Sequence, residues 1–139
     1  MAQTITPYLL YEDCDAMLEW LARAFGFREV LRHRSPDGNV WHAEMELGEA
    51  AIYMGDPGDD YRSPKRLGGV TQSLFVLVDD VDSHYARAQA AGAEITEEPS
   101  DKEYGFRQYG AHDPEGHAWF FATATRQVAP EEWGAEVAS

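Results

Sequence analysis

The stretch "DPEGHAWFF", from Asp113 to Phe121, is a polar turn followed by an apolar run, and it has a counterpart earlier in the chain. At an offset of 67 positions, Tyr53 falls on Phe120 and Met54 falls on Phe121. An internal repeat of this length sets the architecture before any single motif is considered. The stretch is therefore one half of a duplication and not an isolated hairpin.

The same offset relates the two segments that lead into the predicted helices. It aligns "PYLLYEDCDA" (residues 7–16) with "LFVLVDDVDS" (residues 74–83), so that Asp13 falls on Asp80. Each segment is a β-rich run followed by an acidic pair, and aspartate is a favoured N-cap. The residues that follow repeat at helical spacing on one apolar face, and a glycine ends each pattern. Each copy therefore begins with a strand and an Asp-capped helix.

Three strands are predicted after each helix, at residues 28–34, 40–47 and 50–54 in the first copy and at 94–97, 106–112 and 117–123 in the second. The predicted fold class is α+β, built from two βαβββ repeats within one domain. The predicted boundaries are repeat one at 4–56, a linker rich in Gly, Pro and charge at 57–70, repeat two at 71–124 and a peripheral tail at 125–139.

The composition of the chain limits the classes of partner that the protein can bind. The chain has 139 residues, and its 25 acidic and 11 basic residues give a net charge of −14, which repels phosphate backbones and argues against a nucleic-acid partner. The apolar runs are too short for a membrane span, and the N-terminus lacks the pattern of a secretory signal, so we expect no membrane partner and a cytoplasmic location. The single cysteine, Cys14, excludes an internal disulfide and is interpreted as a small residue at a helix start.

Two consecutive βαβββ units with Asp-capped helices and a "DPEGH" turn resemble the vicinal oxygen chelate superfamily. This superfamily includes glyoxalase I, extradiol dioxygenases, fosfomycin-resistance enzymes and bleomycin-resistance binding proteins. The resemblance covers residues 4–124, and the segments "TPYLLYED", "HAEMELGEAAIYMGD" and "YGFRQYGAHDPEGHAW" are similar to the PhnB-like, bleomycin-resistance-type branch. It implies that each sheet curls into half a barrel, with helices on the outer face and a ligand cleft on the concave face. It also implies a homodimer in which two chains complete each cleft.

In the metal enzymes of the superfamily, four residues on the concave face (His or Gln, Glu, His and Glu) bind a divalent cation. The resemblance transfers these positions to Thr6, Tyr53, Ser73 and Phe120, and the internal offset pairs them consistently. Two hydroxyls, a phenol and a phenyl ring are poor ligands for hard and borderline cations alike. We therefore predict no metal and no cofactor. An aromatic, mildly polar wall at these positions suits a flat or amphipathic organic ligand.

Strand alternation extends the predicted cleft, because residues two apart share a face. In "VWHAEMEL" the apolar residues should face the helices, which leaves His42 and Glu44 on the cleft side. Their repeat partners at the same offset are Tyr109 and Ala111, with Arg107 on the same face. The predicted ligand-binding set comprises Thr6, Tyr8, His42, Glu44, Tyr53, Ser73, Phe75, Arg107, Tyr109 and Phe120.

Three functions are compatible with this set. The preferred one is a metal-independent binding protein, and not an enzyme, that sequesters a bulky aromatic or cationic compound such as an antibiotic. The alternative is a lyase, isomerase or dioxygenase that binds a metal through His42 and Glu44 or uses them as acid and base. His42 and Glu44 would supply two ligands of a metal site, which still needs a third and a fourth that the sequence does not identify. Simple hydrogen bonding at the cleft rim is therefore the favoured role of the pair. A third function is a regulatory domain whose cleft binds a metabolite.

Overall fold

The computed structural model describes residues 3–139 and confirms the α+β fold with two βαβββ repeats. The first repeat, which we call the first module, consists of β1 (Tyr8–Leu10), α1 (Cys14–Phe25), β2 (Arg28–Arg34), β3 (Val40–Leu47) and β4 (Ala50–Gly55). The second module consists of β5 (Ser73–Leu77), α3 (Val81–Ala90), β6 (Glu94–Asp101), β7 (Phe106–His112) and β8 (Ala118–Ala124). The short helix α2 (Pro64–Leu67) lies in the predicted linker, and a single 3-10 turn (Pro130–Trp133) lies in the tail.

Both long helices begin at the predicted aspartates. The side chain of Asp13 accepts a hydrogen bond from the backbone N–H of Ala16 at 3.0 Å, and that of Asp80 accepts one from Ser83 at 3.2 Å. At the end of α1, Gly26 adopts the left-handed conformation with φ of 83°, which glycine reaches without steric cost. The caps explain why the two helices start at equivalent points of the repeat.

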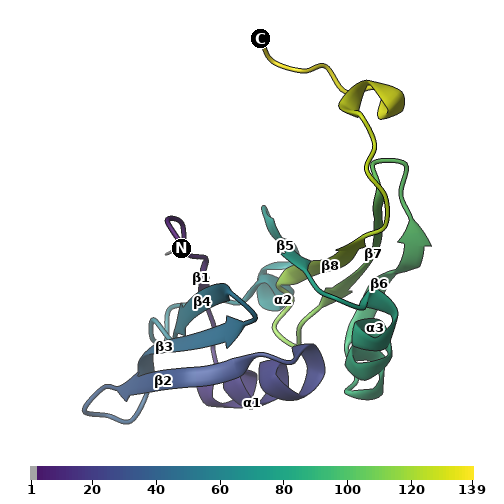
Figure 1. The fold of residues 1–139 in the computed structure, drawn as a ribbon. Coiled ribbons are helices and arrows are strands. Elements are labelled where there is room, and N and C mark those ends of the chain that lie inside the picture. The colour runs from purple at the N-terminus through teal and green to yellow at the C-terminus, as the bar shows by residue number, and fades with distance from the viewer. Residues whose placement is uncertain (1–2) are drawn as a thin grey trace.

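The two modules form two separate, open sheets of four strands each. Their strand orders are β1-β4-β3-β2 and β5-β8-β7-β6. The strands β1 and β5 run parallel to β4 and β8, and the other pairs are antiparallel. Figure 1 shows the sheets side by side, with the C-terminal tail leading away from the body. As a result, β1 and β5 are both edge strands with one unpaired side.

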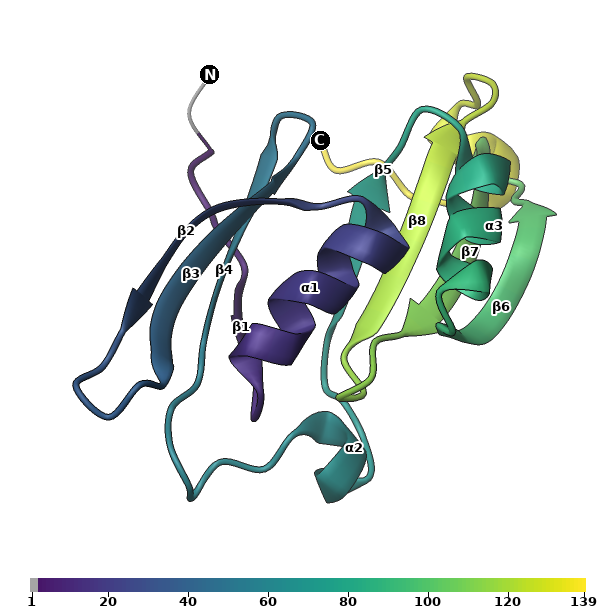
Figure 2. The same ribbon diagram turned by 90° about the horizontal axis from the view of Figure 1, so that it is seen from below.

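The helices cover the same side of both sheets, as Figure 2 shows. The ring of Phe25, at the end of α1, packs against Trp119 at 5.4 Å and against Phe121 at 4.6 Å between ring centroids. Both of these partners belong to β8 of the second module and are fully buried. One continuous core therefore joins the two modules on the helix side, and the opposite faces of the sheets remain open.

Polar contacts add to this junction. The carboxylate of Glu115, in the turn before β8, accepts hydrogen bonds from the backbone N–H groups of Glu12 at 2.6 Å and Asp13 at 2.9 Å. The backbone carbonyl of the same residue accepts a bond from the N–H of Lys65 in α2 at 2.9 Å. The linker also reaches the first module, because the backbone N–H of Ser63 donates to the carboxylate of Glu12 at 3.0 Å. Within residues 3–139, none of the helices is long and apolar enough to cross a membrane.

Candidate functional site

The open face of the first sheet carries a group of polar and aromatic side chains. Ala43 and Met45 on β3 are fully buried on the helix side, so His42 and Glu44 project from the other face, as predicted. Tyr53 on β4 stands opposite both Glu44 on β3 and Tyr8 on β1 in the register of the sheet. Three strands therefore bring four predicted site residues together on one surface.

Three of these four side chains form a continuous hydrogen-bond chain. The Oη atom of Tyr8 lies 2.8 Å from Nδ1 of His42, and Nε2 of His42 lies 2.8 Å from Oε2 of Glu44. The ring of Tyr53 packs edge-on against His42 at 5.1 Å and against Tyr8 at 6.0 Å between centroids. Partial burial and the charges of Cys14 and Glu44 raise the pKa of the Tyr8 phenol. We name this group the Tyr8–His42–Glu44 chain.

A glycine makes room for the chain. A Cβ atom added at Gly55 would lie 2.3 Å from the carbonyl oxygen of Trp41 and 3.4 Å from Oη of Tyr8. Only glycine allows β3 and β4 to approach this closely at that point. The sequence placed Tyr8 and His42 on the same face, but the hydrogen bond between them was not predicted.

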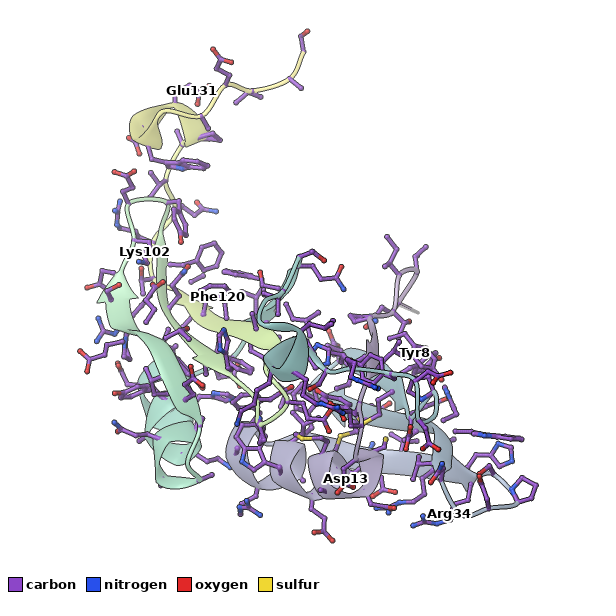
Figure 3. The ribbon with its side chains drawn as sticks, turned by 180° about the vertical axis from the view of Figure 1, so that it is seen from behind. Tyr8, Asp13, Arg34, Lys102, Phe120 and Glu131 are labelled. Carbon is purple, nitrogen blue, oxygen red and sulfur yellow. The ribbon has the colours of Figure 1, made fainter. Side chains whose placement is uncertain are left out.

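The open face of the second sheet is aromatic. Phe75 on β5 stands opposite Phe120 on β8, and its ring meets Phe106 on β7 edge-on at 5.6 Å between centroids. Phe75 is 51% exposed and Leu77 is 63% exposed, so this face presents apolar surface to solvent. Figure 3 shows Tyr8 and Phe120 on different sheets, on the side remote from the start of α1 at Asp13. The two modules thus offer one polar wall and one aromatic wall.

Two predicted site residues do not lie on the open face. Tyr109 has no exposed surface, and its hydroxyl lies 2.5 Å from Nδ1 of His84 on α3. Arg107 contacts Asp82 on the same helix at 3.1 Å and Asp101 at 3.5 Å. Both side chains therefore point to the helix side of the second sheet. The expectation that they share the face of His42 and Glu44 was wrong, and their role in ligand binding stays a prediction.

The error has a simple geometric cause, which is the length of one turn. Between the paired residues Leu47 and Ala50 the first module has a two-residue turn, Gly48 and Glu49. The equivalent backbone bond in the second module joins the N–H of Asp113 to the carbonyl of His117 and encloses three residues, 114–116. The strand before the longer turn, β7, is therefore shifted by one position relative to the constant offset of 67. A shift of one residue exchanges the two faces of a strand.

The shift identifies two residues that the sequence analysis missed. Gln108 and Gly110 stand where His42 and Glu44 stand in the first module, since Gly110 is opposite Phe120 as Glu44 is opposite Tyr53. A Cβ atom at Gly110 would lie 2.9 Å from the ring of Phe120, so the ring covers the glycine. Gln108 is buried, and its side-chain oxygen accepts a hydrogen bond from the Tyr104 hydroxyl at 2.5 Å. The longer turn was the available signal for this shift.

The positions that the resemblance assigns to metal ligands do not fit a divalent cation. They carry two hydroxyls, a phenol and a phenyl ring: Thr6, Tyr53, Ser73 and Phe120. Nor do His, Cys, Asp and Glu side chains of the described part of the chain gather anywhere in threes with the geometry of a metal site. His42 and Glu44 bind one another instead. These positions therefore do not supply a ligand set for a metal-dependent step.

A groove of about 650 Å³ runs between the modules. Pro7 and Ala51 line it from the first module, and Leu74, Phe75 and Leu77 line it from the second. The groove opens between the β1–β4 pair and β5, and β1 and β5 are each one of the two edge strands of their sheets. The volume of the groove lies within the range of small-molecule sites, and the lining of the groove is largely apolar.

Comparisons with known proteins agree on the architecture. The family model of the Glyoxalase/Bleomycin resistance protein/Dioxygenase superfamily matches residues 4–121. TioX from Micromonospora sp. ML1 is 36% identical with a TM-score of 0.73, and the match covers 88% of this chain and 99% of TioX. An uncharacterized protein of Mycobacterium bovis is 29% identical over 97% of this chain and 92% of its own length. The fosfomycin resistance protein FosX from Listeria monocytogenes shares the fold, with a TM-score of 0.66 at 13% identity over 95% of this chain and 98% of FosX.

Proposed function

The chain belongs to the Glyoxalase/Bleomycin resistance protein/Dioxygenase superfamily, and from this premise we propose that it is a metal-independent protein that binds and sequesters a flat aromatic compound. The observation that carries the proposal is the aromatic wall of the second module. Its rings are the exposed Phe75 and the half-buried Phe120 and Phe106, and Phe120 stands at a position that the resemblance assigns to a metal ligand. Exposed aromatic faces of this kind bind planar ligands by stacking and by burial of apolar surface.

The polar wall of the first module sets the orientation of the ligand in this proposal. Tyr53 offers a ring, whereas Tyr8, His42 and Glu44 offer hydrogen-bonding atoms on the same surface. Sites for small molecules combine a mostly apolar lining with a few placed polar groups. A bulky aromatic compound with a polar or cationic edge, such as an antibiotic, fits this combination. The net charge of −14 favours a cation over an anion.

We further propose that two copies of the chain complete the cleft. The edges of β1 and β5 are unpaired, and large apolar side chains lie exposed beside them, including Ile5, Leu10 and Leu77. A second copy that placed its aromatic wall opposite the polar wall would cover this surface in a symmetric dimer. Sedimentation velocity is expected to give a dimer, and a monomer at every concentration would contradict this part of the proposal.

Thermal shift with chelator-treated protein tests the binding function. A panel of planar aromatic compounds, including bleomycin-type antibiotics, is expected to raise the melting temperature without any added metal. Tyr53→Ala and Phe120→Ala should weaken that binding more than His42→Ala does, because the two rings supply most of the apolar contact. Tyr85→Ala, a ring on the helix side of the second module, is the control.

The proposal fails if stabilisation by an aromatic compound appears only after a divalent ion is added back. It also fails if His42→Ala abolishes binding while both ring variants bind like the wild type. A Tyr85→Ala variant that lost binding as strongly as Phe120→Ala would show that the losses reflect stability and not the site.

A further inference from the structure

The Tyr8–His42–Glu44 chain has a defined hydrogen-bond direction, and we propose that it makes the Tyr8 oxygen a general base toward a flat aromatic compound that carries an acidic C–H or O–H. This activity goes beyond sequestration. It rests on the proposed function in one respect, since the compound must enter the cleft that two copies of the chain are proposed to complete.

The direction follows from the donors and acceptors available. An ionised carboxylate can only accept, so the contact of 2.8 Å to Glu44 requires a proton on Nε2 of His42. In the neutral imidazole Nδ1 is then an acceptor, so the Tyr8 hydroxyl must donate to it across 2.8 Å. The single proton of the phenol points into the protein. Its oxygen is left with lone pairs on the open side.

The surroundings hold this geometry. His42 and Glu44 are each partly buried, with 29% of each side chain exposed. Tyr53 packs edge-on against both Tyr8 and His42, which restricts the rotation of the two rings. The order hydroxyl, imidazole, carboxylate is the order of the groups in hydrolase triads, where the carboxylate orients the imidazole and stabilises its protonated form. Here a phenol takes the place of the serine.

The proton-transfer step balances without a further reactant. The proton of the substrate C–H or O–H bonds to the Tyr8 oxygen while the phenol proton passes to Nδ1 of His42. The electron pair of the broken bond stays on the substrate as a carbanion, enolate or phenolate. Glu44 stabilises the new imidazolium. The extra proton then passes to water or to a different atom of the substrate, His42 returns a proton to the Tyr8 oxygen, and the starting state is restored. No electron is gained or lost by the protein.

The chain is present in only one of the two copies of the repeat. In the second module Phe75 takes the position of Tyr8, and Gln108 and Gly110 take the positions of His42 and Glu44. These residues cannot relay a proton. Each complete cleft would therefore contain one basic atom, opposite an aromatic wall that can hold a planar substrate.

Nitrobenzisoxazole is a suitable probe, because it is flat and aromatic and carries one acidic C–H. A general base removes that proton, the carbon–nitrogen bond becomes a nitrile and the ring N–O bond breaks, which releases a coloured cyano-nitrophenolate. Turnover by the full-length protein is followed by absorbance. Loss of kcat/KM by about 10²-fold or more is expected in Tyr8→Phe, His42→Gln and Glu44→Gln, since positioned bases contribute at least this much.

Tyr85→Phe is the matched control for Tyr8→Phe, because it removes a phenol from the helix side of the second module. Its kcat/KM is expected to equal that of the wild type. If Tyr8→Phe keeps the wild-type rate, the base is not Tyr8 and the proposal is wrong. If Glu44→Gln keeps the wild-type rate, the carboxylate takes no part and the proposal is equally wrong.

Nitrogen NMR of His42 supplies a readout that a purely structural role would not affect. The neutral ring is expected to carry its proton on Nε2, and the Nδ1–H tautomer would reverse the direction and overturn the proposal. Binding of the product phenolate is measured separately in each variant. Loss of turnover with binding retained in Glu44→Gln supports the relay. Binding that is unaffected in Phe120→Ala counts against the proposed function and not against the relay.

Discussion

Tyr11 of the first module donates a hydrogen bond of 2.7 Å to the buried carboxylate of Asp113 in the second module. The same carboxylate accepts bonds from Nε1 of Trp119 at 3.1 Å and from the backbone N–H groups of Glu115 at 3.0 Å and His117 at 3.1 Å. One carboxylate thus satisfies four donors at the junction between the copies. Buried charges are tolerated only when they are paired and hydrogen-bonded in this way.

Replacing this carboxylate should be costly. Asp113→Asn keeps the shape but presents an amide N–H₂ to donors that need an acceptor, so the free energy of unfolding should fall by at least about 2 kcal/mol. Urea denaturation followed by fluorescence measures the change. Asp59→Asn, at an exposed position, should stay within about 0.5 kcal/mol of the wild type. Equal stability of the two variants would mean that the junction does not depend on Asp113.

His84 gives the stability of the fold a pH dependence of known sign. Its Nε2 donates to the carbonyl of Phe25 at 2.9 Å and its Nδ1 accepts from Tyr109, and burial, with a smaller effect of Arg87, lowers the pKa of the ring. The folded state therefore binds a proton less readily than the unfolded state. As the pH falls below about 6.5, the unfolded chain takes up the proton first and stability decreases toward the lower folded pKa.

The matching experiment compares wild type with His84→Gln, which has no titrating ring. Urea midpoints at about pH 7 and about pH 5 should show a larger loss in the wild type than in the variant. Carboxylates that titrate in the same range contribute equally to both proteins, so the difference isolates His84. A larger loss in the variant would reverse the sign and contradict the account.

Gly110 should resist enlargement. In Gly110→Ala the new Cβ would meet the Phe120 ring at 2.9 Å and Oγ1 of Thr96 at 2.8 Å, so overpacking should cost about 1–3 kcal/mol. The ring should also be displaced, which weakens binding of planar compounds. In a Phe120→Ala background the same substitution should cost less, and a double-mutant cycle measures the coupling. Strict additivity of the two substitutions would show that the ring does not rest on the glycine.

Cys14 should report unfolding. Burial raises the pKa of this thiol to about 12, so little thiolate exists at about pH 8 and the native protein should react slowly with iodoacetamide. Urea beyond the unfolding midpoint should accelerate alkylation by about 10²-fold or more, because the chain has only this cysteine and unfolding exposes it. Mass spectrometry follows the adduct. Rapid labelling in the absence of urea would show that the start of α1 opens readily.

The repeat made most of the architecture predictable from sequence. Asp13 and Asp80 marked both helix starts, and the alternation in "VWHAEMEL" assigned His42 and Glu44 to the correct face. The prediction that failed was the assignment of faces in the strand 106–112. One face of this strand carries Phe106 and Gln108, and the other carries Arg107 and Tyr109. Neither set is clearly polar, so periodicity could not decide between them. The assignment then relied on a constant offset, which the longer turn breaks.

The link between Tyr8 and His42 could not be predicted for a different reason. The two residues are 34 positions apart in the sequence. Their strands, β1 and β3, are not neighbours in the sheet, because β4 lies between them. Contacts across an intervening strand depend on side-chain length and on the space left at Gly55, and neither quantity appears in a pattern of polar and apolar residues. Three-dimensional packing supplies that information.

The extra residue among 114–116 has an evolutionary consequence. A single inserted codon in a loop can interchange the inward and outward side chains of a whole strand, with no change in the backbone scaffold. Twin halves of a duplicated gene can therefore acquire different chemistries in one mutational event. In this protein the shift turns Tyr109 toward the helices and Gln108 toward the other face of the sheet.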